Sequence, residues 1–313
     1  MGPARRHLHH AVGAALLAAA LLLSAAVPGA TAQQETEDEH GFSYVPGSPN
    51  GPDRWGKINT LWAECSNGEM QSPIDLSDDR VTLVRSLGFL NYSYRPAEAS
   101  IVNRGHDIQV KFSGDAGRLV INGTVYHLRQ LHWHTPSEHT VDGRRYVMEL
   151  HLVHQTTENK TAVIGVFYET GNIPDLFLKT LEPSIRRIGD TRDREEPIGV
   201  VDPNGARATG SVYYRYMGSL TTPPCTEGVV WTVFKTVCLN LNAWMAASRV
   251  AGMGWVGLAS LTSSPQPFFR KPMSSTFQVL CLCRFAMWPS TSWIFSGRQW
   301  LTAMRTTRGR FRR

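Results

Sequence analysis

The stretch Leu128-Arg129-Gln130-Leu131-His132-Trp133-His134 alternates polar and apolar side chains through its second half. A period of two is typical of a β-strand whose two faces meet different surroundings. Gln130, His132 and His134 are therefore expected to point to the same side of one strand.

A second alternating stretch runs from Tyr146 to His154, and Glu149, His151 and Val153 share one of its faces. The dipeptide Asp142-Gly143 lies between the two stretches and predicts a turn. The two strands can therefore pair as an antiparallel hairpin, which would bring the histidines of both strands together.

The hairpin predicts a cluster of three histidines, His132, His134 and His151. Three neutral imidazoles that leave a fourth position open are the ligand set of a catalytic zinc site. Gln130 and Glu149 each lie two residues from a histidine on the same face, where each can bind the second ring nitrogen. A His-x-His pair alone would more often be two polar residues on a strand than a metal site, and the third histidine with its acidic neighbour strengthens the metal interpretation.

Three other motifs have ordinary interpretations when they are read alone. Glu138-His139 is compatible with a polar turn, and His106 in Asn103-Arg104-Gly105-His106 with an exposed loop histidine. Thr221-Thr222-Pro223-Pro224 is compatible with a rigid turn before a strand.

The rest of the chain between residues 70 and 235 consists of short alternating segments separated by turn signals. Asn122-Gly123 predicts a two-residue hairpin turn. The apolar runs 162–168 and 229–234 predict buried strands, and 176–188 is the best helix candidate. We expect a mainly β fold with one core.

The net charge of +6 is unevenly distributed along the 313 residues. Residues 33–227 carry 19 basic and 26 acidic side chains, whereas residues 228–313 carry 11 basic and no acidic side chains. A groove that binds nucleic acid needs its positive charge on the folded body. The hypothesis that the protein binds nucleic acid or a membrane surface would therefore depend on the basic tail alone.

Residues 1–32 have the pattern of a secretory signal peptide. Arg5 and Arg6 precede an apolar run, and Ala30-Thr31-Ala32 resembles a cleavage site. The alternative is an uncleaved anchor. Signal cleavage would leave no stable membrane anchor and would place the chain in an oxidising compartment.

Three glycosylation triplets fit the secretory route, and they begin at Asn91, Asn122 and Asn159. The five cysteines leave at least one without an intrachain partner, and their pairing stays open.

Several motifs together resemble the α-class carbonic anhydrases, and most of all the secreted plant members. The similarity covers about residues 42–235. The motifs are Gln71-Ser72-Pro73-Ile74-Asp75-Leu76, Asn103-Arg104-Gly105-His106, the stretch from Gln130 to His154, and Gly218-Ser219-Leu220-Thr221-Thr222-Pro223-Pro224-Cys225. The resemblance implies a single domain with a large twisted, mostly antiparallel central sheet and small peripheral helices.

The resemblance also implies a role for each matching residue. The zinc ligands would be His132, His134 and His151, with Gln130 and Glu149 as partners of His132 and His151. Thr221 would donate to a buried glutamate, Glu138, and orient the nucleophile; Thr222 would contact bicarbonate. His106 would carry protons, and Tyr44 would belong to the active-site water network.

Further residues match the apolar wall around carbon dioxide and the disulfide of secreted members. The wall residues are Val153, Val163, Leu220, Val229 and Trp231. The disulfide would join Cys65 to Cys225.

The implied function is zinc-dependent, reversible hydration of carbon dioxide to bicarbonate and a proton by zinc-bound hydroxide. The cofactor is Zn²⁺ and the partner is this small-molecule substrate, with no nucleic acid. The alternative is a catalytically weak or inactive binding or storage protein on the same fold. The implied location is the extracellular space or apoplast; a plastid reached through the secretory route is the alternative.

The resemblance ends after about Lys235. The family continues with a strand, a helix and an Asn-x-Arg-Pro segment, and the chain has none of these. A shifted reading of possible codons for residues 304–310 gives Asn-Ala-Arg-Pro. We interpret 236–313 as a non-family basic tail that arose from a retained intron or mis-spliced junction and an out-of-frame final exon. A basic surface tail is the alternative.

Under this interpretation, the α-carbonic anhydrase-like domain at 33–235 is incomplete, because it lacks the family's C-terminal segment. The strand edge that the lost segment covers in the family is then expected to be open. His134 is also expected to lose a backbone carbonyl partner, which would weaken zinc binding about 10–100-fold.

Overall fold

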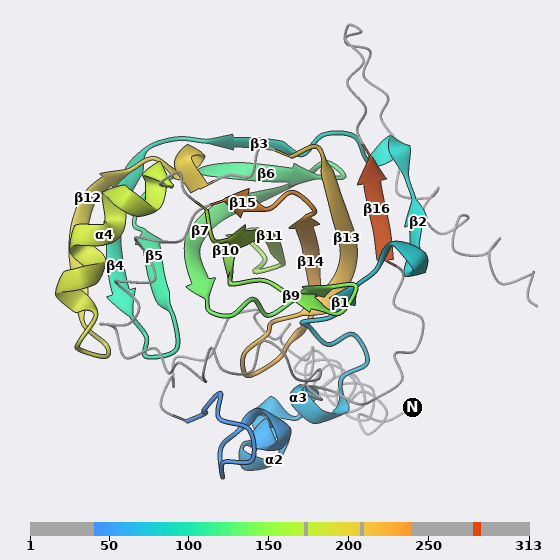
Figure 1. Ribbon diagram of the computed structural model, residues 1–313, viewed down its shortest axis with the longest axis horizontal. Helices are drawn as coiled ribbons and strands as arrows, with labels where there is room; N and C mark the ends of the chain where they lie inside the picture. Colours follow the sequence, from blue (N-terminus) through green and yellow to red (C-terminus); the bar gives the residue numbers. More distant parts are fainter. Residues whose placement is uncertain (1–40, 172–174, 207–209, 240–277, 283–313) are drawn as a thin grey trace, which may run out of the picture. The chain divides into compact units, whose positions relative to one another are not determined.

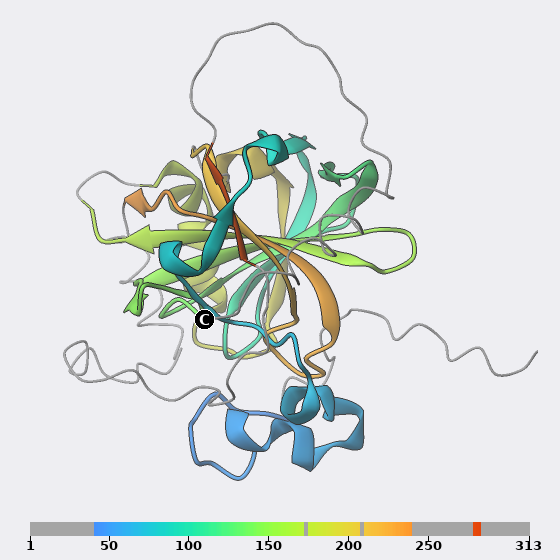
Figure 2. The ribbon, with the colours of Figure 1, turned by 90° about the vertical axis from the view of Figure 1, so that its right-hand side faces the viewer.

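The computed structural model describes residues 41–171, 175–206 and 210–239, and the backbone of 278–282. The predicted signal peptide and most of the predicted tail lie outside these ranges. A 13-stranded, mostly antiparallel sheet forms the centre of the fold (Figure 1). It is strongly twisted, and α2 and α3 lie at one end of it (Figure 2). The mainly β fold predicted from the sequence is confirmed.

The main path through this sheet has the strand order β12-β4-β5-β7-β10-β11-β14-β13-β16-β2, and β3, β6 and β15 pair beside it. Its strands are β2 (Val81–Leu83), β3 (Asn91–Tyr94), β4 (Ala97–Asn103), β5 (Ile108–Phe112), β6 (Gly117–Ile121), β7 (Thr124–His134), β10 (Met148–Gln155), β11 (Thr161–Glu169), β12 (Glu195–Val201), β13 (Val212–Ser219), β14 (Glu227–Phe234), β15 (Cys238–Leu239) and β16 (Gln278–Leu282).

The remaining elements are short, apart from one helix. A three-stranded sheet contains β1 (Asp75–Leu76), β8 (Thr140–Val141) and β9 (Arg144–Arg145). The α-helices are α2 (Trp55–Ile58), α3 (Glu64–Asn67) and α4 (Leu176–Ile188). Short 3-10 helices span Pro52–Arg54, Thr60–Trp62, Asp78–Arg80, Arg85–Leu87 and Pro203–Ala206. Over the described ranges, no helix is long and apolar enough to cross a membrane.

The large sheet has a different environment on each face. Leu131 and Trp133 of β7 point into a hydrophobic core that also contains Leu181 and Ile185 of α4. The opposite face carries His132 and the other polar residues of the site. Because side chains alternate along a strand, one face of β7 packs into the core and the other carries the polar residues of the candidate site.

Local sequence signals correctly predicted several elements. Asn122 and Gly123 have φ angles of 49° and 79° and join β6 to β7 by a tight turn. The buried runs became β11 and β14. The helix α4 has the expected bounds; Asp175 caps its first turn by accepting a hydrogen bond from the Leu178 N–H at 2.8 Å.

The edge of β13 is covered, contrary to the open edge expected from the sequence. Residues 278–282 form β16, which pairs antiparallel with β13 and parallel with β2. Both views place β16 between these strands (Figures 1 and 2). Backbone N–H and C=O groups accept any extended segment as a partner. The tail can therefore fill this position without matching the family sequence.

Candidate metal centre and active site

The three predicted metal ligands come from two neighbouring strands. β7 and β10 pair antiparallel, and His132 lies directly opposite His151. The ring centroids of His132, His134 and His151 are 4.8–5.1 Å apart, and all three side chains are buried. One ligand atom from each lies within 4.8 Å of the others. The structure thus brings the predicted cluster together.

Hydrogen bonds fix the orientation of two of these rings. His132 Nδ1 lies 2.8 Å from Gln130 Oε1, and His151 Nε2 lies 2.9 Å from Glu149 Oε1. Both oxygens are acceptors, so these ring nitrogens carry the protons. The other nitrogens, His132 Nε2 and His151 Nδ1, then direct lone pairs toward each other across 3.3 Å. Burial lowers the pKa of His132 well below its ordinary value, which keeps this imidazole neutral.

This arrangement fits a zinc ion. Tetrahedral zinc with Zn–N bonds of about 2.0–2.1 Å separates two ligand nitrogens by about 3.3–3.4 Å. The spacing of 3.3 Å between His132 Nε2 and His151 Nδ1 agrees with that geometry. Two facing lone pairs repel each other unless a cation lies between them, so the donor set itself favours a bound metal.

A second possible metal group contains His139, Glu149 and His151. Hydrogen bonds already join its members, because Glu149 Oε1 accepts from His139 Nδ1 at 2.7 Å and from His151 Nε2 at 2.9 Å. A metal ion would have to displace both protons. The three-histidine cluster is therefore the better candidate for a metal site.

Glu149 belongs to a buried chain of hydrogen bonds. Its Oε2 accepts the backbone N–H groups of Glu138 and His139, both at 2.9 Å. Burial alone would raise the pKa of Glu149, but His139 and His151 hold it well below its ordinary value. The carboxylate is therefore charged where it holds His151.

This series of hydrogen bonds continues to residues that the sequence analysis did not predict as part of the site. His139 Nε2 lies 2.6 Å from the Tyr216 hydroxyl, which lies 2.9 Å from Ser72 Oγ. Ser72 N–H in turn donates to Ser219 Oγ at 2.8 Å. Read alone, Glu138-His139 is compatible with a polar turn. The hydrogen-bond partners of His139 lie 10 and 77 residues away in the sequence. No local pattern predicts these contacts.

Glu138 lies beside the metal ligands. Its Oε2 is 3.5 Å from His134 Nε2 and 4.0 Å from His151 Nδ1. The Tyr44 hydroxyl donates to Glu138 Oε1 at 3.3 Å, and Thr221 lies within hydrogen-bonding range of the same carboxyl. Burial raises the pKa of Glu138. The hydroxyl predicted for the water network thus bonds directly to this glutamate.

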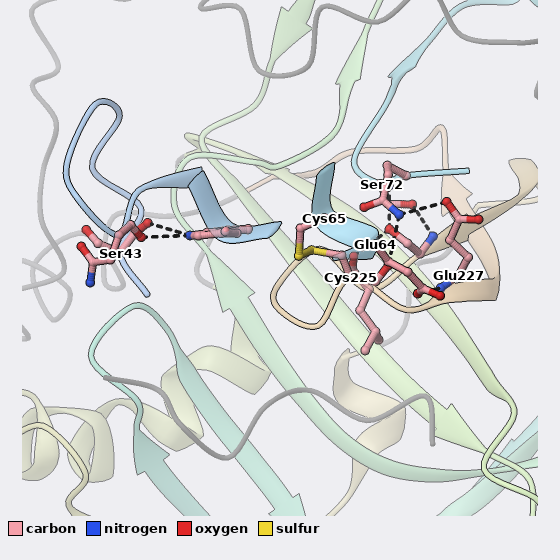
Figure 3. Close-up of a disulfide and its surroundings, with 11 residues drawn as sticks. Ser43, Glu64, Cys65, Ser72, Cys225 and Glu227 are labelled. Atoms are coloured by element: carbon pink, nitrogen blue, oxygen red, sulfur yellow. Dashed lines mark hydrogen bonds between the residues drawn. A yellow bond between two sulfur atoms is a disulfide. The ribbon is translucent and has the colours of Figure 1, made fainter. Parts of the chain in front are cut away.

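The loop that carries the two predicted threonines is tied down by a disulfide. Cys65 of α3 is bonded to Cys225, as the resemblance implied (Figure 3). Cys225 N–H donates to Thr222 O at 2.9 Å, and Leu220 N–H donates to Thr226 O at 3.0 Å. Thr221 and Thr222 are both buried. Covalent and backbone bonds together hold this loop in place, and Thr221 lines a cavity together with His132 and His151.

A small, mostly apolar cavity adjoins the histidine cluster. His132 and His151 line it together with Thr221. Four of the predicted wall residues complete the lining, namely Val153, Val163, Leu220 and Trp231. The fifth, Val229, is buried in the same hydrophobic cluster. The space accommodates roughly one water-sized molecule.

His106 lies at the tip of a rigid turn. Asn103 Nδ2 donates to the carbonyl groups of Ile188 and Gly189 at the end of α4, at 3.2 and 3.0 Å. A buried ion pair between Arg104 and Asp107 closes the turn. These contacts fix the backbone on both sides of His106.

The His106 ring packs against two aromatic residues. Its centroid is 5.3 Å from that of Phe42 and 5.4 Å from that of Tyr44, and its side chain is 10% exposed. The Tyr44 ring is also 6.5 Å from the His134 ring. Tyr44 therefore lies between the predicted proton carrier and the metal cluster. Phe42 was not predicted as part of this region.

Comparisons with known proteins agree with this geometry. The family model "Eukaryotic-type carbonic anhydrase" matches residues 50–247. Alpha carbonic anhydrase 7 of Arabidopsis thaliana is 47% identical over 222 residues, which is 71% of this chain and 80% of the relative. Dioscorin DB3S of Dioscorea polystachya is 44% identical over 217 residues, 69% of this chain and 79% of the relative.

Solved structures show the same fold. Dioscorin in complex with ascorbate has a TM-score of 0.68 and 38% identity, covering 77% of this chain and 97% of that one. The α-carbonic anhydrase of Photobacterium profundum has a TM-score of 0.63 and 30% identity. The match covers 76% of this chain and 99% of that one. The family model spans well over half of the sequence, and the chain belongs to the eukaryotic-type carbonic anhydrase family.

Proposed function

We propose that the chain is a zinc-dependent carbonic anhydrase that interconverts carbon dioxide with bicarbonate and a proton. The observation that carries the proposal is the pair of lone-pair-bearing nitrogens, His132 Nε2 and His151 Nδ1, which face each other at 3.3 Å. His134 supplies the third imidazole. Three neutral ligands leave the full charge of a bound zinc ion to act on a fourth ligand.

The histidines and their partners prepare the metal site. In carbonic anhydrases the bound zinc lowers the pKa of its water ligand, which supplies a nucleophile near neutral pH. Gln130 and Glu149 hold His132 and His151 in the ligating tautomer. The negative charge on Glu149 also makes the His151 ring a stronger donor.

The cavity residues bind and orient the reactants. Carbon dioxide is apolar, and Val153, Val163, Leu220 and Trp231 offer it an apolar wall. Thr221 donates its hydroxyl proton to Glu138, so its oxygen lone pairs are left to accept a hydrogen bond from the nucleophile. Thr222 lies in the same loop, where it can contact bicarbonate.

His106 moves the released proton away from the site. Imidazole titrates near neutral pH, which suits a group that both accepts and releases a proton. The rigid turn at 103–107 keeps the ring close to Tyr44 and the metal cluster.

The secretory route is part of the proposal. Disulfides form and persist mainly in oxidising compartments, so the Cys65–Cys225 bond agrees with the signal-peptide pattern at 1–32. The proposed location is the extracellular space or apoplast, with a plastid reached through the secretory route as the alternative.

A binding or storage protein with weak or no catalysis is the second candidate. Glu138 Oε2 is buried and makes no hydrogen bond within the described part of the chain. A carboxyl oxygen without a donor is poorly fixed, which would loosen the orientation of Thr221. Relatives on this fold include the dioscorins.

Zinc content and carbon dioxide hydration of the full chain separate the two candidates. We expect one zinc per chain after dialysis and measurable hydration. His151→Ala should lose the zinc, whereas His127→Ala, a matched histidine-to-alanine change on the neighbouring strand β7, should keep it. Unchanged zinc stoichiometry in His151→Ala would refute the metal site. Bound zinc without hydration would favour the binding protein, and hydration restored by translating residues 236–313 in the family frame would assign the defect to the tail.

A further inference from the structure

Three exposed asparagines begin Asn-x-Ser/Thr triplets. Asn91 is the first residue of β3, Asn122 begins the turn between β6 and β7, and Asn159 lies in the loop between β10 and β11. Asn122 and Asn159 have φ angles of 49° and 61°, as residues of tight turns do. All three side-chain amides are therefore presented at the surface.

Strand pairing brings these three positions to the same end of the sheet. His127 near the start of β7 pairs with Gln155 at the end of β10, so the turn before β7 and the loop after β10 lie side by side. Asn91 pairs with Val120, two residues before Asn122. The chain separates the three triplets, and the fold gathers them.

This end of the sheet lies far from the metal cluster. His132 is eight residues after Thr124 along β7, a separation of roughly 25 Å for an extended strand. Phe42 and Tyr44 pack at the opposite end, beside α2 and α3. β3 and β6 lie on the side of the sheet away from these helices (Figure 1). Large groups on the three asparagines would leave the metal site accessible.

One of the three positions borders exposed apolar surface. Val120 of β6 pairs with Asn91 on one side and with Val125 on the other, so the three side chains form a row on one face. Val125 is 37% exposed. A sugar on Asn91 would cover these two valines, which gives modification there a physical benefit.

We propose that Asn91, Asn122 and Asn159 carry N-linked glycans, which cluster at the end of the sheet remote from the metal site. The side-chain amide nitrogen forms a bond to the anomeric carbon of the first sugar. A lipid-linked oligosaccharide diphosphate is the donor; the lipid diphosphate leaves with the bonding electrons, and the amide nitrogen loses a proton. This proposal does not depend on zinc chemistry.

Mass mapping of the full chain secreted by plant cells tests the proposal. Peptide-N-glycosidase A, which also cleaves the core-fucosylated glycans of plants, releases each glycan and converts its asparagine to aspartate. Release in heavy-oxygen water labels each converted residue and separates it from spontaneous deamidation at Asn122-Gly123. We expect labelled conversion at all three positions. Half-buried Asn59 is followed by Thr60 and Leu61, which do not complete a glycosylation triplet, and should remain asparagine. Oxidised Cys65–Cys225 in the same sample shows that the chain passed through an oxidising compartment.

Sequon variants assign each glycan. Ser93→Ala and Thr124→Ala leave the asparagines in place and should each remove one glycan. Asn159→Gln serves for the third site, because Thr161 is buried in β11 and should not be changed. Ser93→Ala should also increase the binding of a hydrophobic dye relative to Thr124→Ala, because it uncovers Val120 and Val125.

Three outcomes would overturn the proposal. The first is oxidised protein without conversion at any of the three positions. The second is glycan-free protein with both thiols reduced, which would exclude the secretory route. The third is conversion at a single position, which would exclude a cluster. Zinc uptake that is equal before and after glycan removal is expected; uptake that rises on removal would contradict glycans placed away from the site.

Discussion

The Tyr44 hydroxyl donates a hydrogen bond to Glu138 Oε1 at 3.3 Å. Residues 94 positions apart are thereby joined next to the metal ligands. Tyr44→Phe should lower kcat about tenfold, because a hydrogen bond to a charged group contributes roughly 1.5 kcal/mol or more. Zinc stoichiometry should not change. Stopped-flow hydration measures the effect, with Tyr92→Phe as the control, and an unchanged kcat would exclude Tyr44 from positioning Glu138.

Replacing His106 should slow proton release and spare the chemistry at the metal. His106→Ala should reduce turnover by about a hundredfold in weak buffer, and a small imidazole buffer should restore much of it by carrying the proton directly. Thr221→Ala should not respond to buffer, because it disturbs the orientation of the nucleophile. Isotope exchange between carbon dioxide and bicarbonate should persist in His106→Ala. If both variants are equally insensitive to buffer, His106 is not the proton carrier.

The buried side chain of His154 should make stability depend on pH. His154 lies behind the site, accepts a hydrogen bond from the Tyr94 hydroxyl at 2.8 Å and donates through Nδ1 to Ala162 O at 3.2 Å. Burial lowers its pKa to about 4, below the value of about 6.5 in an unfolded chain. The fold therefore favours the neutral ring. Its contribution, on the order of 3 kcal/mol, is complete above pH 6.5 and is lost as the pH falls toward 4.

Urea unfolding at pH 7.5, 6, 5 and 4.5 measures that loss. The stability difference between the parent chain and His154→Gln should shrink steadily across this range. His127→Gln, a change at a less buried histidine on β7, is the control and should show no such convergence. A constant difference for His154→Gln would mean that this ring is not held neutral by the fold.

Removing the disulfide should destabilise the chain and loosen the threonine loop. Cys65 and Cys225 are 160 residues apart, so their bond restricts the unfolded chain strongly. Cys225→Ser should lower the free energy of unfolding by about 2–5 kcal/mol, whereas Cys238→Ser, at a free and half-buried thiol, should change it much less. Chemical denaturation measures both. Peptide mapping that finds both Cys65 and Cys225 as free thiols in secreted protein would contradict the bond.

Features with a local cause could be predicted from the sequence. The turn at Asn122-Gly123 and the helix from Leu176 to Ile188 depend on neighbouring residues, and both have the expected positions. The pairing of β7 with β10 was expected from the alternation in both segments and from the turn dipeptide Asp142-Gly143 between them. Contacts made across the fold could not be predicted in this way. The partners of His139 lie 10 and 77 residues away, and no pattern around this histidine indicates them.

The strand β16 could not be predicted from the sequence for a different reason. Its segment has no family motif, and sequence reasoning therefore left the edge of β13 open. The pairing depends on backbone groups that all residues share, so side-chain patterns do not reveal it.

The antiparallel pairing of β7 with β10 also affects how the family can evolve. All three histidines of the proposed metal site lie between residues 132 and 151, whereas Thr221 and Thr222 come from a loop some seventy residues later that is anchored separately by Cys225. The two segments meet at the hydrogen bond between His139 and the Tyr216 hydroxyl, but the disulfide anchors only the second. For the proposed function, changes in the threonine loop should lower turnover while the three histidines stay in place, and changes at the histidines should remove the proposed metal site while the apolar pocket stays. Each change is confined to one short stretch of gene.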